Sequence, residues 1–313
     1  MSVLVGDIGG TNLRLATFEQ GNLTSIESVR NVTVDHWSTP ILDYAKRFGP
    51  FSSISLGVAG PVMDGEAQLM NHAWKIDAKT LSAELQIPVL LLNDFHAQAF
   101  AVPRLTPAQW EGLDDLTPRA HGHIALLGAG TGLGEAVCVW TGQSYFPVAG
   151  EGSHGRFGPQ NERQIQLLRG LMTQWPHHVS VERVVSGPGL VNTYDVLRGP
   201  HPRHPKLKTM DPAAAITQLG LAEECPIATE TLEIFVDVLA DEAASLALKC
   251  NATEVYLSGG IPPRIPSVLH RRFRSAFEKK GRYQSMMAGI PVRLITEDNM
   301  GLLGAGYATE HGA

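Results

Sequence analysis

Two glycine-rich stretches decide the fold of this chain: Gly6-Asp7-Ile8-Gly9-Gly10-Thr11-Asn12 and Gly128-Ala129-Gly130-Thr131-Gly132-Leu133-Gly134. Each follows an apolar run, at residues 3–5 and 124–127, and each leads into another apolar-rich segment. Strand, glycine turn and strand is the arrangement of a β-hairpin. Because glycine has no Cβ, such a turn exposes backbone N–H groups to an anion. The two turns together predict a site for the phosphates of one nucleotide.

The hydrophobic pattern around these turns predicts one α/β topology used twice. The first hairpin is followed by a predicted strand at 26–29, a helix at 40–48, and buried strands at 54–58 and 88–92. The same order restarts with strands at 124–127, 135–140 and 145–148, then helices, and later strands at 254–258 and 291–295. Three antiparallel strands followed by alternating helices and strands indicate a mixed five-stranded sheet. We expect a small α/β domain, residues 1–104 and 295–313, and a large one, residues 105–294.

Composition excludes several classes of protein. The 313 residues suggest about two domains, and 43% of them are hydrophobic, enough for full cores. With 25 basic against 31 acidic residues and no basic run, no nucleic-acid partner is expected. No apolar stretch approaches about 18 residues, so no membrane partner is expected. Three scattered cysteines and a start that runs into a predicted strand favour a reduced, cytoplasmic protein without a signal peptide.

Asn93 and Asp94 follow the apolar run at 89–92, where a buried strand meets a predicted helix at 95–102. Ligands of α/β sheets bind at the carboxyl ends of strands. Either residue could simply cap the helix, since Asn and Asp are preferred N-caps. Alternatively, Asp94 is a catalytic carboxylate that the helix N-terminus keeps ionised. Both interpretations of Asp94 stay open on the residues alone.

Glu151, His154 and Glu182 are candidate ligands for a substrate that presents hydroxyl groups. A carboxylate can accept protons from two adjacent hydroxyls, and a histidine can recognise a third. Glu151 lies between two glycines, in a turn. A charged turn residue is often only solvated, and His154 could cap a turn, so a purely structural role remains the alternative for both.

Asp7 and Thr11 belong to the first glycine turn, and Thr131 belongs to the second. Asp7 repels phosphate, so its chemical role would be to hold Mg²⁺, directly or through water; alternatively, it only stabilises the turn. Neither turn is a P-loop, because no Lys-Ser or Lys-Thr pair closes it. Gly259 and Gly260 end a buried strand, where adenosine could lie against bare backbone or the chain could simply turn.

The ordered set of motifs resembles the bacterial glucokinase family, which belongs to the hexokinase and actin-like superfamily. The resemblance is carried by both glycine turns, Leu92-Asn93-Asp94-Phe95, Gly150-Glu151-Gly152-Ser153-His154, Ser186-Gly187-Pro188-Gly189 and Ser258-Gly259-Gly260-Ile261. It also includes Asn71-His72-Ala73-Trp74 in the family pattern. The chain lacks the cysteine zinc cluster of a related group, so it resembles the zinc-free glucokinases. Arg156 departs from the family pattern, which leaves the exact sugar open.

This resemblance implies a two-lobed actin-like ATPase fold, of ribonuclease H-like type, with a deep interdomain cleft. It implies a homodimer that uses ATP and Mg²⁺ to phosphorylate glucose, with Asp94 as general base and Asp7 at the metal. The implied sugar ligands are Asn93, Asp94, Glu151, His154 and Glu182. The implied nucleotide-binding residues are Gly6, Asp7, Ile8, Gly9, Gly10, Thr11, Gly130, Thr131, Gly132, Gly259 and Gly260.

Two other functions remain compatible with the sequence. One is a kinase for another hexose, which a panel of sugars would distinguish because a pocket built for one hydroxyl can reject its epimer. The other is a non-catalytic sugar sensor on the same fold. Retention of Asp94 and the lack of an added basic segment favour an enzyme over a sensor.

Overall fold

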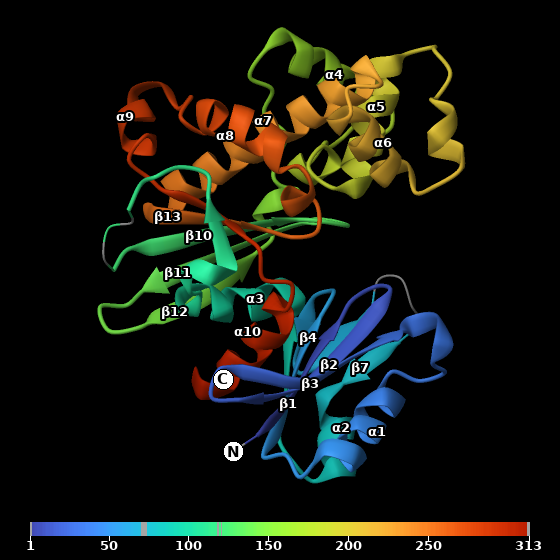
Figure 1. The fold of residues 1–313 in the computed structure, drawn as a ribbon, viewed down its shortest axis with the longest axis vertical. Coiled ribbons are helices and arrows are strands. Elements are labelled where there is room, and N and C mark those ends of the chain that lie inside the picture. Colours follow the sequence, from blue (N-terminus) through green and yellow to red (C-terminus); the bar gives the residue numbers. More distant parts are fainter. Residues whose placement is uncertain (1, 70–73, 118, 120, 312–313) are drawn as a thin grey trace. The chain divides into compact units, whose positions relative to one another are not determined.

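The computed structural model describes residues 2–69, 74–117, 119 and 121–311 (Figure 1). Contacts divide the chain into two units. The first runs to Thr106 and includes Ser144–Ala149 and the segment from Glu297; the second comprises Pro107–Gln143 and Gly150–Thr296. The expected division placed residues 144–149 in the large domain, whereas their contacts group them with the first unit. Asn71, His72 and Ala73 of the family motif lie outside the described residues.

The first unit is built on a five-stranded sheet in the order β3-β2-β1-β4-β8 (Figure 1). Its strands are β1 Val3–Ile8, β2 Asn12–Glu19, β3 Asn22–Arg30, β4 Ser53–Val58 and β8 Val89–Asn93. β1 pairs antiparallel with β2 and parallel with β4, and β4 pairs parallel with β8. This is the mixed sheet that the sequence predicted. The parallel pairs β1–β4 and β4–β8 bring the carboxyl ends of these three strands to one edge, where the first glycine turn and Asn93 lie.

Four α-helices accompany this sheet among the described residues of the first unit: α1 Ser38–Phe48, α2 Ala78–Leu85, α3 Asp94–Ala101 and α10 Met300–Ala308. α10 packs so closely on α3 that a Cβ at Gly304 would overlap the carbonyl oxygen of Ala97. α2 and a small sheet, β5 Val62–Met63, β6 Glu66–Gln68 and β7 Lys75–Asp77, were not predicted. Strands of two or three residues are too short to show an alternating pattern.

The second sheet has six strands in the order β12-β11-β10-β13-β14-β9. Its strands are β9 Trp110–Gly112, β10 His123–Ala129, β11 Leu133–Trp140, β12 Tyr145–Gly150, β13 Ala252–Ser258 and β14 Val292–Ile295. β10 pairs antiparallel with β11 and parallel with β13. The first five strands therefore repeat the order of the first sheet, as the sequence predicted. The short β9 is an unpredicted addition, antiparallel to β14.

The α-helices of the second unit include α4 Glu162–Met172, α5 Gly187–Arg198, α6 Pro212–Leu221, α7 Pro226–Cys250, α8 Pro266–Phe277 and α9 Gln284–Met287. α5, α6 and α8 pack against α7, which buries an extensive apolar surface (Figure 1). Phe235 of α7 and the pair Phe273 and Phe277 of α8 are fully or almost fully buried in one core. Burying such rings contributes roughly 1.5–3 kcal/mol each, which holds these helices on the sheet.

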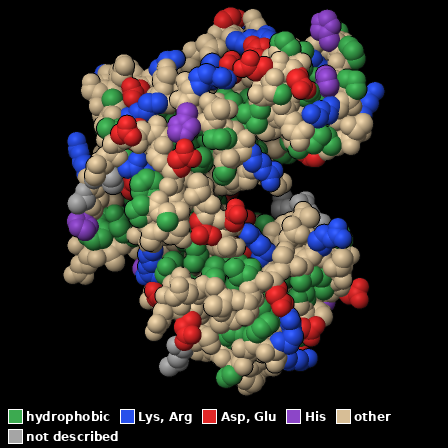
Figure 2. All heavy atoms as spheres, viewed as in Figure 1, with side chains coloured by type: hydrophobic (Ala, Val, Ile, Leu, Met, Phe, Trp, Pro, Cys, Tyr) green, Lys and Arg blue, Asp and Glu red, His purple; other side chains and the backbone are tan. Residues whose placement is uncertain are grey.

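Short 3-10 helices complete the secondary structure. They are η1 Asn31–Thr33, η2 Val102–Arg104, η3 Pro107–Gln109, η4 Gly152–His154, η5 Val181–Arg183, η6 Pro205–Lys208, η7 Pro262–Arg264, η8 Gly281–Tyr283 and η9 Thr309–His311. None of the helices within the described residues has the length and apolar character needed to span a membrane. On the face drawn in Figure 2, acidic and basic side chains are interspersed.

Candidate functional site

The first glycine turn is closed by its own backbone and by a buried asparagine. The Gly9 N–H donates to the carbonyl oxygen of Asn12 at 2.9 Å. Asn31 donates its side-chain amide to the Gly9 carbonyl oxygen and its backbone N–H to the Thr11 carbonyl oxygen, each at 2.9 Å. Asn31 is 1% exposed. The sequence analysis missed it, because a single Asn after a strand carries no distinctive signal.

Gly6 and Ile8, which the resemblance assigned to nucleotide binding, lie within β1. A Cβ at Gly6 would lie 2.6 Å from Cδ2 of Leu56, so glycine is needed there for packing. The Ile8 side chain is fully buried. Only the backbone of Ile8 is therefore available to a ligand, and the exposed part of the motif begins after it.

Asp7 is held by an arginine. Arg14 Nη2 donates to Asp7 Oδ2 at 2.5 Å, and Arg14 Nη1 donates to the carbonyl oxygen of Asp298 at 2.9 Å. A Cβ at Gly301 of α10 would lie 2.9 Å from Asp7 Cγ, so this glycine leaves room for the carboxylate. The Asp7 side chain is 17% exposed.

These contacts fit a water-mediated role for Asp7 toward Mg²⁺. The guanidinium of Arg14 occupies Oδ2, so Oδ1 is the oxygen that could accept from a metal-bound water. Mg²⁺ usually keeps several waters and takes one or two carboxylates together with substrate phosphates. In the part of the chain that the structure describes, no cluster of three or more His, Cys, Asp or Glu could hold a metal.

The structure resolves which residue caps α3. Asn93 is the N-cap: its Oδ1 accepts from the N–H groups of Phe95 and His96, both at 3.0 Å. Its Nδ2 donates to the carbonyl oxygen of Gly60 at 3.0 Å. Asp94 is the first residue of the helix, and its Oδ1 accepts from the Phe95 N–H at 2.8 Å. The N-cap of α3 is therefore Asn93 and not Asp94. Asn93 thus has a structural role in addition to any contact with a sugar.

The segment 150–154, named here the sugar turn, displays two of the predicted ligands. Glu151 precedes η4, and His154 ends it. Their side chains are 76% and 58% exposed, and His154 Nε2 lies 3.6 Å from Glu151 Oε2. Ser153 between them is buried, and His178 Nε2 donates to the His154 carbonyl oxygen at 2.7 Å. The backbone of the turn is thus anchored while both polar side chains face solvent.

Glu182 in η5 is tied to the second glycine turn. Its Oε2 accepts from the Leu133 N–H at 3.0 Å, and a Cβ at Gly132 would lie 2.6 Å from the same oxygen. The Val181 N–H donates to the carbonyl oxygen of Gly155, immediately after the sugar turn, at 3.0 Å. One short segment therefore connects the sugar turn with the second glycine turn.

Arg156, the departure from the family pattern, is exposed and forms an isolated backbone bridge with Ser180. Its backbone thus helps to join the segment after the sugar turn to the segment before η5.

The second glycine turn meets two other predicted turns. The Gly130 N–H donates to the Gly132 carbonyl oxygen at 2.8 Å, and the Gly187 N–H donates to the Gly130 carbonyl oxygen at 2.7 Å. Gly259 has φ +90°, and a Cβ there would overlap the Ala129 carbonyl oxygen, so only glycine fits. Gly130 and Gly260 consequently border the same cavity.

This cavity has a volume of about 810 Å³ and lies entirely within the second unit. Its lining includes Gly130, Thr131, Gly187, Pro188, Asp211, Pro212, Ala213, Thr217, Gly260 and Arg264. The first residues of α5 and α6 both border it, and helix N-termini carry partial positive charge that favours phosphate. Its size is typical of small-molecule sites. Sequence reasoning missed α6 and Arg264 as parts of this cavity, although Asp211-Pro212 is a recognisable helix start.

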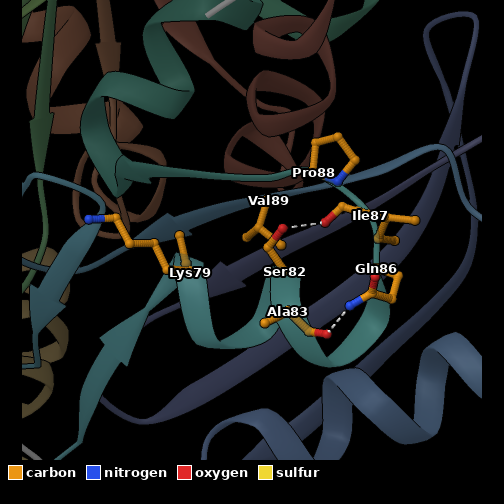
Figure 3. Close-up of a pocket in the computed structure, with 8 residues that line it drawn as sticks. Lys79, Ser82, Ala83, Gln86, Ile87, Pro88 and Val89 are labelled. Atoms are coloured by element: carbon orange, nitrogen blue, oxygen red, sulfur yellow. Dashed lines mark hydrogen bonds between the residues drawn. The ribbon is translucent and has the colours of Figure 1, made fainter.

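A second cavity, of about 740 Å³, lies on α2 of the first unit (Figure 3). It is lined by Ala78, Lys79, Ser82, Ala83, Gln86, Ile87, Pro88 and Val89, none of which was a predicted site residue. In Figure 3 the Ser82 hydroxyl donates to the Ile87 carbonyl oxygen and the Gln86 amide to that of Ala83. These two hydrogen bonds satisfy backbone carbonyl groups at the end of α2.

Comparison with known proteins gives a consistent result. A family model described as Glucokinase matches residues 4–312. The glucokinase of Nostoc is 32% identical over 332 residues, covering 97% of each chain. That of Tolumonas auensis is 35% identical over 311 residues, covering 97% of this chain and 95% of the other.

Solved structures agree. A glucokinase from an Antarctic psychrotroph matches with a TM-score of 0.87 at 30% identity, covering 99% of both chains. A ROK family glucokinase from Streptomyces griseus, solved with glucose and AMPPNP, matches with a TM-score of 0.69 at 18% identity over all of both chains, a likeness of fold. These likenesses confirm the predicted two-lobed actin-like ATPase fold. With a family model that matches nearly its full length and relatives above 30% identity, this chain belongs to the glucokinase family.

Proposed function

We propose that this protein phosphorylates glucose to glucose 6-phosphate with ATP, and that Asp94 is the general base. Family membership supports the reaction. The observation that carries the assignment of Asp94 is its place in the fold: it is the first residue of α3 and directly follows the parallel strand β8. A helix N-terminus keeps a carboxylate ionised, and ligands of α/β sheets bind at the carboxyl ends of strands.

In the proposed reaction, glucose is bound through Asn93, Asp94, Glu151, His154 and Glu182. The exposure of Glu151 and His154 supports this role, because their polar atoms can exchange water for sugar hydroxyls. Asp94 accepts the proton of the 6-hydroxyl as that oxygen attacks the γ-phosphorus of ATP. Phosphoryl transfer depends mainly on positioning and charge neutralisation, so an orienting carboxylate is the main chemical group required from the protein.

ATP would bind to the exposed backbone of the two glycine turns. In the second unit, the cavity bordered by Gly130, Thr131 and Gly260 supports this, since two helix N-termini and Arg264 supply positive charge. Glycines at these positions let phosphates or adenosine approach the backbone. Mg²⁺, when bound, neutralises charge on the phosphates, and Asp7 would hold it through water.

The decisive experiment replaces the carboxylate of Asp94 and leaves Asn93, the N-cap of α3, in place. Asp94→Asn removes the negative charge while Asn93 still accepts from both helix N–H groups, so the fold should persist. We expect the kcat for glucose phosphorylation to fall at least about a hundredfold, with the thermal midpoint nearly unchanged. Turnover within tenfold of the unmodified protein would refute the role of Asp94.

Measuring kcat/KM with glucose, mannose, fructose and amino sugars tests which hexose is the preferred substrate. Glucose should give the highest kcat/KM, and a higher value for another hexose would reassign the substrate. Sugar binding without ADP formation would instead indicate a sensor.

We further propose a homodimeric protein located in the cytoplasm. The family resemblance supports the dimer, and three free cysteines suit a reducing compartment. Sedimentation equilibrium would test the dimer, and cell fractionation would test the location.

A further inference from the structure

Glu135 is a buried acidic residue that the proposed reaction does not use. It lies on β11, opposite Leu127 of β10, and is 3% exposed. Its Oε1 has no hydrogen-bond partner among the described residues. A carboxyl group is rarely buried without partners, and such a group calls for an explanation.

The carboxyl group of Glu135 lies directly against the sugar turn. A Cβ at Gly152 would overlap Oε2 of Glu135 and lie 3.1 Å from its Cδ. A larger residue at position 152 would therefore push the Glu135 carboxyl group or the turn aside. Gly152 follows Glu151 and begins the 3-10 helix that ends at His154, so the backbone carrying both exposed side chains rests on Glu135.

Charged groups face Glu135 from the elements around it. From α7, the carboxylate of Glu242 disfavours its ionisation and the ammonium of Lys249 favours it. The sugar turn itself carries Glu151 and His154. Burial, reinforced by Glu242, raises the pKa of Glu135 to about 7. The charge beneath the sugar turn therefore changes within the neutral pH range.

We propose that Glu135 is a positioning residue for glucose binding: its carboxyl group supports Gly152 and so fixes where Glu151 and His154 are held. This inference rests on the proposed function, because it needs the sugar turn to bind glucose. In this proposal Glu135 contacts neither substrate and acts through the backbone of the sugar turn.

The test adds a methyl group at position 152 and then, in a second variant, also removes the carboxyl group that this methyl group would touch. Gly152→Ala places a methyl group against Glu135, so the KM for glucose should rise at least about tenfold while the KM for ATP stays unchanged. In Gly152→Ala with Glu135→Ala, the shortened side chain makes room, and the KM for glucose should return to that of Glu135→Ala alone. Gly158→Ala is the matched control, because its nearest neighbour would be Gln160 Nε2 at 3.9 Å.

If Gly152→Ala raises the KM for glucose by the same factor in the Glu135→Ala background as in the unmodified protein, the proposal is overturned, and a parallel rise in the KM for ATP would overturn it too. If Gly152→Ala fails to fold, Glu135→Gln provides the test. The KM for glucose should rise between pH 6 and pH 8.5 in the unmodified protein, as a charge forms beneath the turn, and should rise less in Glu135→Gln. Superimposable pH profiles would overturn the proposal. An unmodified protein that does not phosphorylate glucose would refute the proposed function instead.

Discussion

Glu135→Gln should make the stability of this protein less dependent on pH. In the folded protein, burial raises the pKa of Glu135 to about 7 from an ordinary value of 4.5. The folded state therefore holds a proton that the unfolded state has lost, and stability falls with rising pH. The contribution is fully present below pH 4.5 and is lost as the pH rises through 7. This difference in pKa corresponds to roughly 3 kcal/mol.

Urea unfolding across about pH 5 to pH 8 is the assay. The unmodified protein should lose roughly 2 to 3 kcal/mol more than Glu135→Gln over this interval, because most of the titration lies within it. Glu242, whose pKa is also raised by burial, acts in the same direction in both proteins.

Glu224→Gln is the matched control, since Glu224 is an exposed carboxylate in the same unit. Its free energy of unfolding should follow that of the unmodified protein at every pH. If Glu135→Gln also follows the unmodified protein, the argument from burial is refuted.

Other substitutions test the remaining contacts. Gly301→Ala should raise the KM for ATP and leave the KM for glucose unchanged, because its methyl group would crowd the carboxylate of Asp7; steady-state kinetics with each substrate varied checks this, and an unchanged KM for ATP would contradict it. Ser186→Ala removes the N-cap of α5 and should cost about 1 kcal/mol, measured by thermal unfolding; an unchanged midpoint would argue against the cap. Glu182→Ala should raise the KM for both substrates, because Glu182 accepts from the second glycine turn; a rise for glucose alone would show that this link is unimportant.

The local sequence determined the hairpins and the repeated strand order. Glycine clusters between apolar runs specify turns between strands, and both signals act over fewer than about ten residues. This is why the strands of the two larger sheets and their repeat were predicted, whereas β9 and the small sheet of β5, β6 and β7 were not. Their strands are too short to show a period. The candidate residues Glu151 and His154 were recognisable through the resemblance of their motif to the glucokinase family, since a charged residue in a glycine turn is by itself often only solvated.

Tertiary structure alone decided what these residues touch. It made Asn93 the cap of α3, paired Asp7 with Arg14, and placed Glu135 beneath Gly152. The cap depended on where the helix began, to within one residue, which patterns do not resolve. The other two contacts depend on packing between separate elements, because a side chain's neighbours across a sheet or beneath a turn leave no periodic trace in the sequence. Local patterns therefore specified the elements, and long-range packing assigned each side chain its partner.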